Sequence, residues 1–279
     1  MSNTKNSVQA RIKNLSQKIS VNVNTLLASY FFDAFLLRLS KSEYRENFIL
    51  KGGFYLSAIF GIQNRYTQDL DFKLTGQNFA EMNVRDIIEK IVDIQCNDEI
   101  SFDLTSISPI LDEDAYGGFS VVLVGHLENI RQQFTIDIAT GNPITPTAVT
   151  YKYKRLLEET TIDFKAYNLE TILAEKIQTI FKRGLLNSRS KDFYDVYIIK
   201  KLRLSELNIN NLKAAFQNTC KYRETCFSKN EAVKLLESLS SNEQFVLRWK
   251  NYVNKNSFAK DIRFGDVIKA CKVITEFIF

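Results

Sequence analysis

The spacing of apolar and polar residues divides the chain into a first part with helices and strands and a second part with helices alone. In the first part, apolar residues recur every three to four positions over 8–20, 24–40 and 80–92, which predicts three helices. A Gly-Gly pair after Lys51 opens a further short helix, and Gly61 is its expected end.

Strand signals lie between these helices. The clearest is Asp69–Leu74, where apolar and polar residues alternate strictly, as in a half-buried strand. Three more segments, rich in Val, Ile, Phe and Thr, predict strands at 100–108, 118–126 and 131–139. The segment 141–146 ends this series, because its two prolines do not fit inside a central strand.

From residue 168 onward the pattern predicts helices throughout. They are expected at 168–186, 190–202, 208–219, 229–239, 242–254 and 263–277. We therefore expect an α/β (α+β) chain with a mixed sheet, flanking helices and a helical C-terminal domain. The expected domains are N-terminal helices over 1–47 that pack on the core, an α/β core over 48–160 and a helical domain over 161–279.

Composition excludes several classes of protein. An apolar fraction of 45% supports a real core, and no apolar run reaches the roughly 18–20 residues that cross a bilayer. The N-terminus lacks the apolar segment of a secretory signal, so we expect a cytoplasmic protein without a membrane partner. The single histidine, His126, argues against a histidine metal site and a Ser-His-Asp triad. A net charge of +5 permits a nucleotide or nucleic-acid partner without requiring one.

The cysteines add no candidate chemistry. They show no paired metal spacing and are most simply free thiols in a reducing compartment. Their positions are Cys96, Cys220, Cys226 and Cys271.

Two aspartates of one strand are the first candidate site. Asp69 and Asp71 share the polar face of their strand, and a pair so placed can chelate a hard cation such as Mg²⁺. For such a pair taken alone, an exposed strand face is the commoner explanation. Asp137, between Ile136 and Ile138, points opposite to both and could supply a third ligand, or it could be a solvated strand residue.

The Gly52-Gly53 pair is a candidate phosphate site. Glycines allow a close backbone approach, and the N–H groups that begin a helix attract phosphate. Lys51 and Arg65 could add positive charge. A tight turn is the alternative.

Lys176 falls inside the apolar sector of the helix over 168–186. A lysine in that position either extends its ammonium to solvent or meets an anion, which could be phosphate or an aspartate. Asp192 and Asp195 lie on a mostly apolar helix that we expect to begin after Ser190 as N-cap, and they could pair with Lys176 or Arg189.

Basic residues also gather along the second part of the chain. Tyr151 and Tyr153 alternate with one such group, and aromatic and basic residues together can bind RNA. Solvated surfaces are the commoner explanation. The basic residues are Lys152, Lys154, Arg155, Lys182, Arg183, Arg189, Lys191, Lys200, Lys201 and Arg203.

The order of these signals resembles the AbiEii/AbiGii-type toxins, a branch of the nucleotidyltransferase superfamily. Lys51–Leu56 followed by Arg65–Phe72 resembles the first motif of that family, and 136–138 with 141–146 resembles the second. The segments 169–176 and 189–195 are similar to the third and fourth. The resemblance spans 48–200, and no motif matches 1–47 or 204–279.

The resemblance implies roles for individual residues. It makes Asp69 and Asp71 the metal-binding aspartates, with Asp137 in the place of the third carboxylate, as metal ligand or as proton acceptor. It assigns phosphate contacts to Gly52, Gly53 and Thr67, with Lys51, Arg65 and Arg189 as further nucleotide-binding residues. Lys176 matches an essential lysine, and Asp192 matches the principal acid of the fourth motif, with Asp195 beside it. Asn142 stands where an acidic residue is common in the family, so no role is assigned to it.

The implied activity is transfer of a nucleotide from an NTP to an RNA, the tRNA 3′ end in related toxins, with Mg²⁺ or Mn²⁺ as cofactor. Such toxins inhibit growth in toxin–antitoxin and abortive-infection systems that act in phage defence. Their partner is a winged-helix antitoxin, expected here to act through its gene or RNA target and not by a tight complex. A non-catalytic nucleotide- or RNA-binding module and a phosphate-ester hydrolase are the alternatives.

Overall fold

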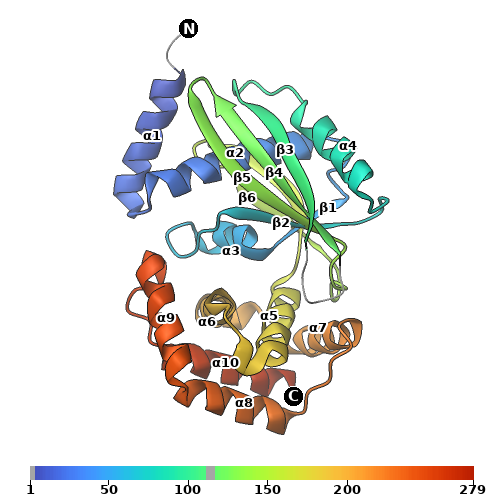
Figure 1. Ribbon diagram of the computed structural model, residues 1–279, viewed down its shortest axis with the longest axis vertical. Helices are drawn as coiled ribbons and strands as arrows, with labels where there is room; N and C mark the ends of the chain where they lie inside the picture. The colour runs from blue at the N-terminus through green and yellow to red at the C-terminus, as the bar shows by residue number, and fades with distance from the viewer. Residues whose placement is uncertain (1–3, 111–116) are drawn as a thin grey trace. The chain divides into compact units, whose positions relative to one another are not determined.

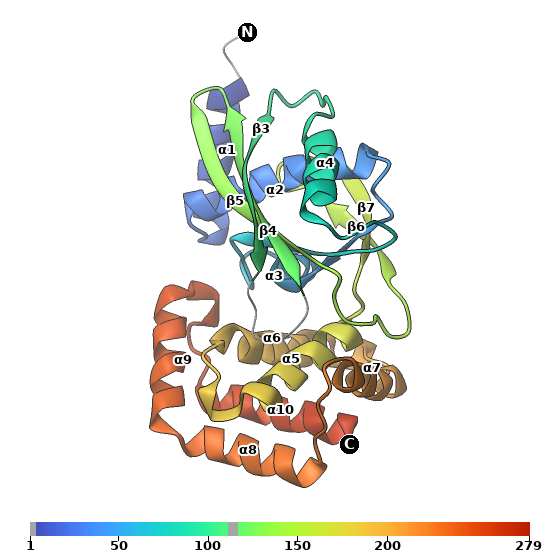
Figure 2. The same cartoon turned by 45° about the vertical axis from the view of Figure 1, so that its right-hand side comes forward.

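The computed structural model describes residues 4–110 and 117–279, which form two compact units (Figures 1 and 2). The sheet unit comprises Met1–Gly141 and Val149–Ala166. The helical unit comprises Asn142–Ala148 and Tyr167–Phe279. The chain therefore enters the helical unit, returns for a last pair of strands and leaves again, whereas the sequence pattern suggested a single boundary at 160.

The sheet unit contains the predicted helices and strands together with three strands that were not predicted. Its helices are α1 (Thr4–Ile19), α2 (Val23–Lys41), α3 (Gly52–Phe60) and α4 (Glu81–Val92). Its strands are β1 (Phe48–Lys51), β2 (Asp69–Leu74), β3 (Ser101–Ile110), β4 (Gly118–Leu127), β5 (Ile130–Ala139), β6 (Val149–Lys154) and β7 (Thr161–Ala166). The unpredicted strands are β1, β6 and β7, which are short and lack a long apolar run.

The strands form one seven-stranded mixed sheet in the order β3-β4-β5-β2-β1-β7-β6. The pairs β2–β5 and β1–β7 are parallel, and the remaining pairs are antiparallel. In β2, Leu70, Phe72 and Leu74 are buried and the alternate residues are half-buried. One face of the sheet therefore meets the core, and the aspartates of β2 stand on the other face.

Helix α2 covers the core face of the sheet, with α4 beside it (Figures 1 and 2). Phe32 of α2 packs edge to face against Phe134 of β5 and Phe54 of α3. A Cβ at Gly125 of β4 would lie 2.2 Å from the ring of Phe31. Glycine at that position therefore lets α2 pack closely on the sheet.

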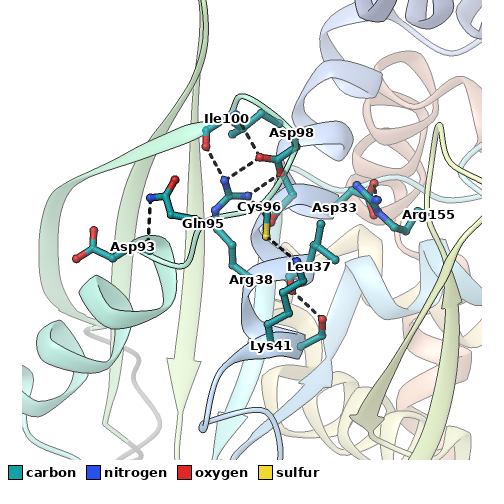
Figure 3. Close-up of polar contacts among 12 residues, drawn as sticks. Asp33, Leu37, Arg38, Lys41, Asp93, Gln95, Cys96, Asp98, Ile100 and Arg155 are labelled. Atoms are coloured by element: carbon teal, nitrogen blue, oxygen red, sulfur yellow. Dashed lines mark hydrogen bonds and ion pairs between the residues drawn. The ribbon is translucent and has the colours of Figure 1, made fainter. Parts of the chain in front are cut away.

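Two ion pairs attach α2 to its neighbours (Figure 3). The guanidinium of Arg38 donates to both carboxylate oxygens of Asp98, at 2.8 and 2.9 Å, and to the carbonyl of Ile100. Arg155, just after β6, donates to the fully buried Asp33 at 3.2 Å. Burial outweighs the attraction of Arg155 and raises the pKa of Asp33 to about 7. These contacts fix the connection into β3 and the end of β6 to α2.

The helical unit contains the predicted helices. They are α5 (Leu169–Arg183), α6 (Ser190–Arg203), α7 (Ile209–Tyr222), α8 (Lys229–Ser241), α9 (Glu243–Lys255) and α10 (Phe264–Ile278). Short 3₁₀ turns follow α5, α6 and α9 at Gly184–Leu186, Leu204–Glu206 and Ser257–Ala259. Helix α5 packs on α6 and α7, and α10 packs on α6, α7 and α8. Side chains from α5, α6 and α10 therefore supply much of this second core.

The start of α6 differs from the sequence-based expectation. The N-cap of α6 is Arg189, and Ser190 is its first helical residue, because the helix begins one position earlier than the serine suggested. Within the same unit, the side-chain amide of Gln178 on α5 is fully buried, where it bonds to Thr225 and Arg223. These hydrogen bonds to the segment that follows α7 compensate for burying that amide.

Among the described residues, no helix combines the length and the apolar character that crossing a membrane requires. All four cysteines lie in the described ranges and are free thiols.

Candidate functional site

Three aspartates meet on the polar face of the sheet. Strands β2 and β5 run parallel, and their register places Asp71 directly beside Asp137. Asp69 lies two residues before Asp71 on the same face. One carboxylate oxygen from each of the three residues lies within 4.8 Å of the others, and all three residues are half-buried. The structure thus brings together the three carboxylates that the sequence nominated.

The chemistry of this donor set fits a hard divalent cation. Mg²⁺ and Mn²⁺ prefer oxygen ligands, and carboxylates are the common protein donors for them. Three carboxylates this close repel one another, and a cation among them would offset that repulsion. Within the described ranges, this trio is the one group of metal-ligating side chains with suitable spacing.

A neutral donor holds one oxygen of each carboxylate. The Thr67 hydroxyl donates to Oδ1 of Asp69, and the backbone N–H of Gly53 donates to Oδ2 of Asp71 at 3.2 Å. The Ser120 hydroxyl donates to Oδ1 of Asp137 at 2.8 Å. Sequence reasoning missed Ser120, because no local pattern shows that β4 places it beside Asp137. Only the pairing of β4 with β5 does so.

The glycine pair is shaped by the residues that pack against it. Gly52 has φ +67°, and a Cβ there would lie 1.9 Å from Oδ2 of Asp71. A Cβ at Gly53 would lie 2.9 Å from the Thr67 hydroxyl and 3.0 Å from the guanidinium of Arg65. Gly52 therefore requires glycine, and a side chain at Gly53 would displace Thr67 or Arg65. The N–H at the start of α3, expected to meet phosphate, donates to Asp71 in this structure.

Lys51 and Arg65 lie near the same carboxylates. Lys51, the last residue of β1, is the register partner of Asp71. Arg65 is buried, and its side chain donates to the carbonyl of Tyr66 while lying against Gly53. The sheet unit thus gathers the aspartates, the glycine pair, Thr67 and these two cations in one region.

Lys176 and the aspartates of α6 form a separate group in the helical unit. The ammonium of Lys176 lies 2.6 Å from Asp192 and 3.0 Å from Asp195. Arg189 donates to the second oxygen of Asp192 at 2.8 Å. The side chains of Asp192 and Asp195 are 1% and 0% exposed, so the inward lysine meets aspartates, one of the two kinds of anion considered from the sequence.

The charges in this group stabilise one another. Burial disfavours the ionised form of Asp192, but Lys176 and Arg189 outweigh it and lower its pKa to about 2. Burial likewise disfavours the ammonium of Lys176, but Asp192 and Asp195 outweigh it and raise the pKa of Lys176 above its usual value. Lys176 and Asp192 are therefore both charged at neutral pH.

Asn142, in the segment that the helical unit takes from the middle of the chain, is buried in a polar network. It donates to Glu175 at 2.6 Å and accepts from Arg223 at 3.1 Å. Its contacts attach this segment to α5 and to the residue that follows α7.

Other candidates from the sequence have structural contacts. Tyr153 is buried against Phe54 and Phe164, and the Tyr151 hydroxyl donates to the carbonyl of Ala58. The alternation of Tyr and Lys on β6 thus reflects one buried and one exposed side of an edge strand, so Tyr153 cannot stack on a base. His126 contacts Asp103 at 2.8 Å on the neighbouring strand.

Solved structures share the fold of this mixed sheet and its helices. A "putative nucleotidyltransferase from H. pylori" matches with a TM-score of 0.55 and 15% identity over 92% of this chain and 96% of that one. JHP933 from Helicobacter pylori matches with a TM-score of 0.53 and 15% identity over 92% and 93%. At such identities the likeness establishes the fold.

The family follows from the sequence match. Residues 34–270 match the model of the nucleotidyl transferase AbiEii toxin of type IV toxin–antitoxin systems, so the chain belongs to the AbiEii family. It is a nucleotidyltransferase toxin of that class, and the family implies a nucleotide substrate and an antitoxin. No curated protein matches the chain.

Proposed function

We propose that this toxin transfers a nucleotide from an NTP to the 3′-hydroxyl of an RNA, with tRNA as the acceptor, in a reaction that depends on Mg²⁺ or Mn²⁺. The observation that carries the proposal is the meeting of Asp69, Asp71 and Asp137 on one face of the sheet. Such a trio has the donor chemistry and the spacing for divalent cations in nucleotidyl transfer.

The three carboxylates would hold the cation, which supplies Lewis-acid stabilisation of the triphosphate charge and lowers the pKa of the attacking hydroxyl. Asp71 and Asp137 are fixed side by side by the register of β2 and β5, so little reorganisation is required of them. Gly52 and Gly53 leave room for phosphate oxygens to approach the backbone beside Asp71, with Lys51 and Arg65 as nearby positive charge.

The family motifs extend the proposal to the helical unit. They assign Lys176 the neutralisation of charge on the leaving pyrophosphate, with Asp192 as the group that orients the lysine and its basic neighbour Arg189. This part rests on the motif resemblance. Lys176→Ala should abolish transfer, and its folded fraction is measured alongside because the lysine pairs with two buried aspartates.

Charge distribution supports an RNA acceptor. The helical unit has 20 basic and 12 acidic residues, whereas the sheet unit has 17 basic and 20 acidic residues. An excess of positive charge attracts the phosphate backbone of RNA, and such binding weakens as salt rises. We therefore expect RNA affinity to fall steeply with added KCl.

The test is incubation of the full chain with total RNA, Mg²⁺ and each α-³²P-labelled NTP in turn. A labelled tRNA-sized band, absent with EDTA and absent for Asp69→Ala, is the expected result. Release of inorganic phosphate without labelled RNA would instead indicate a hydrolase. Tight nucleotide binding without turnover would indicate a non-catalytic module.

The same proposal places the protein in the cytoplasm in phage defence, with a winged-helix antitoxin that acts on its operon or on the RNA target. Co-expression should restore growth without a stable complex on size-exclusion chromatography. Co-elution of toxin and antitoxin in a fixed ratio would contradict this mode of action.

A further inference from the structure

Ser120 stands in the same row of the sheet as the carboxylates. The register pairs Lys51 with Asp71, Asp71 with Asp137, Asp137 with Ser120 and Ser120 with Ser108. Residues paired in this way project on the same side of a sheet. The row therefore crosses from β1 to β3, with Ser120 directly beside the outermost carboxylate.

The contact between Ser120 and Asp137 has a defined direction. An ionised carboxylate only accepts hydrogen bonds, so the serine hydroxyl must donate, and its oxygen lies 2.8 Å from Oδ1 of Asp137. The hydroxyl is short and its strand is paired on both sides, by β3 and by β5. This bond therefore limits rotation of the Asp137 carboxylate.

We propose that Ser120 is a positioning residue for the cation site, which holds Asp137 in the orientation in which it serves as a ligand. This inference rests on the proposed metal dependence of the enzyme. Hydrogen-bond donors that orient metal ligands typically contribute 10–100-fold to metal affinity. Ser120 would thus serve Asp137 as Thr67 and the N–H of Gly53 serve Asp69 and Asp71.

The experiment measures Mn²⁺ binding to the full chain without nucleotide, by calorimetry and by the loss of the free Mn²⁺ electron paramagnetic resonance signal. Ser120→Ala should raise the Kd about 10-fold, while its unfolding midpoint in EDTA equals that of the wild type. Ser120→Thr retains the hydroxyl and a side chain suited to a strand, so it should restore affinity. Ser108→Ala, the same change one strand farther from the carboxylates, should bind Mn²⁺ as the wild type does.

The outcomes separate this inference from the proposed function. Equal Mn²⁺ affinity for Ser120→Ala and the wild type overturns the role of Ser120. Two further results overturn it: Mn²⁺ binding that is unchanged in Asp137→Asn, and a wild type that binds no Mn²⁺. A wild type that binds Mn²⁺ through the trio but labels no RNA overturns the proposed reaction and leaves the role of Ser120 intact.

Discussion

The protein contains two clusters of aspartates that differ in charge balance. On the sheet, three half-buried carboxylates gather within 4.8 Å, and neutral donors hold one oxygen of each. In the helical unit, Asp192 and Asp195 are more deeply buried and are paired with Lys176 and Arg189. The first cluster collects like charges, whereas the second combines opposite ones.

This difference indicates different contributions to the protein. Ions buried with partners of opposite charge stabilise the fold in the sense that removing one partner is costly. Like charges held close together cost stability, and such arrangements are typical of functional sites. We therefore interpret the sheet cluster as the site of the reaction and the helical cluster primarily as a contribution to fold stability, even though the family motifs contain both.

The largest expected effect is on catalysis. Asp71→Asn removes one negative charge but retains an acceptor for the N–H of Gly53, so the start of α3 should stay in place. We expect nucleotide transfer to fall by about 10³-fold or more. The free energy of unfolding in EDTA should stay within about 1 kcal/mol or rise, because repulsion is relieved.

Both quantities are measured on the same preparation, by RNA labelling and by urea denaturation. A variant that loses several kcal/mol of stability would mean that the trio supports the fold, and the comparison between the two clusters would then fail.

The second prediction concerns stability in the helical unit. Lys176→Met keeps the apolar stem but leaves Asp192 and Asp195 buried without their shared ammonium. We expect a loss of about 3–5 kcal/mol in the free energy of unfolding, measured by urea denaturation. Lys182→Met, at an exposed position of the same helix, is the matched control and should cost less than about 1 kcal/mol. Equal losses of unfolding free energy in Lys176→Met and Lys182→Met would contradict a structural role for Lys176 and the two buried aspartates.

A cluster can be predicted from the sequence only to the extent that its residues are close together in the chain. Strict alternation over Asp69–Leu74 was enough to predict a strand with two aspartates on one face, and the structure confirms the strand. The neighbour of Asp71 depends on which strand pairs with β2. That pairing joins segments far apart in the chain, so strand signals alone do not specify it. Ser120 went unnoticed for the same reason.

The helical cluster shows the same limit. Helical periodicity placed Lys176 among apolar residues, and in the structure its side chain is only 14% exposed. The pattern left phosphate and aspartate open as partners, because only the packing of α5 on α6 brings Asp192 and Asp195 to the ammonium. Strands β6 and β7 were missed because both are short and carry several exposed polar residues, as a loop does. Pairing of β7 with β1 and of β6 with β7 stabilises them, together with buried residues such as Tyr153 and Phe164.

A third prediction uses the cation itself. A ligand that binds only the folded state stabilises it by about 2.7 kcal/mol at a concentration 100 times its Kd. Mn²⁺ should therefore raise the unfolding midpoint of the wild type and of Lys176→Met by similar amounts. It should leave Asp69→Asn unchanged, as followed by thermal denaturation with and without EDTA. A Mn²⁺ shift that persists in Asp69→Asn would locate the cation away from the trio.

The smallest expected effect is the pH dependence that Asp192 contributes. Its pKa in the folded protein is about 2, below the ordinary value near 4 of an unfolded chain, so the unfolded state takes up the proton first as pH falls. The contribution is fully present above about pH 4 and is lost between about pH 4 and 2, which amounts to about 2 kcal/mol. In urea denaturation, the stability advantage of the wild type over Asp192→Asn should shrink by about that amount over this range. An advantage that stays constant from pH 5 to pH 2 would show that Lys176 and Arg189 do not favour the ionised carboxylate, and the contrast between the two clusters would lose its electrostatic basis.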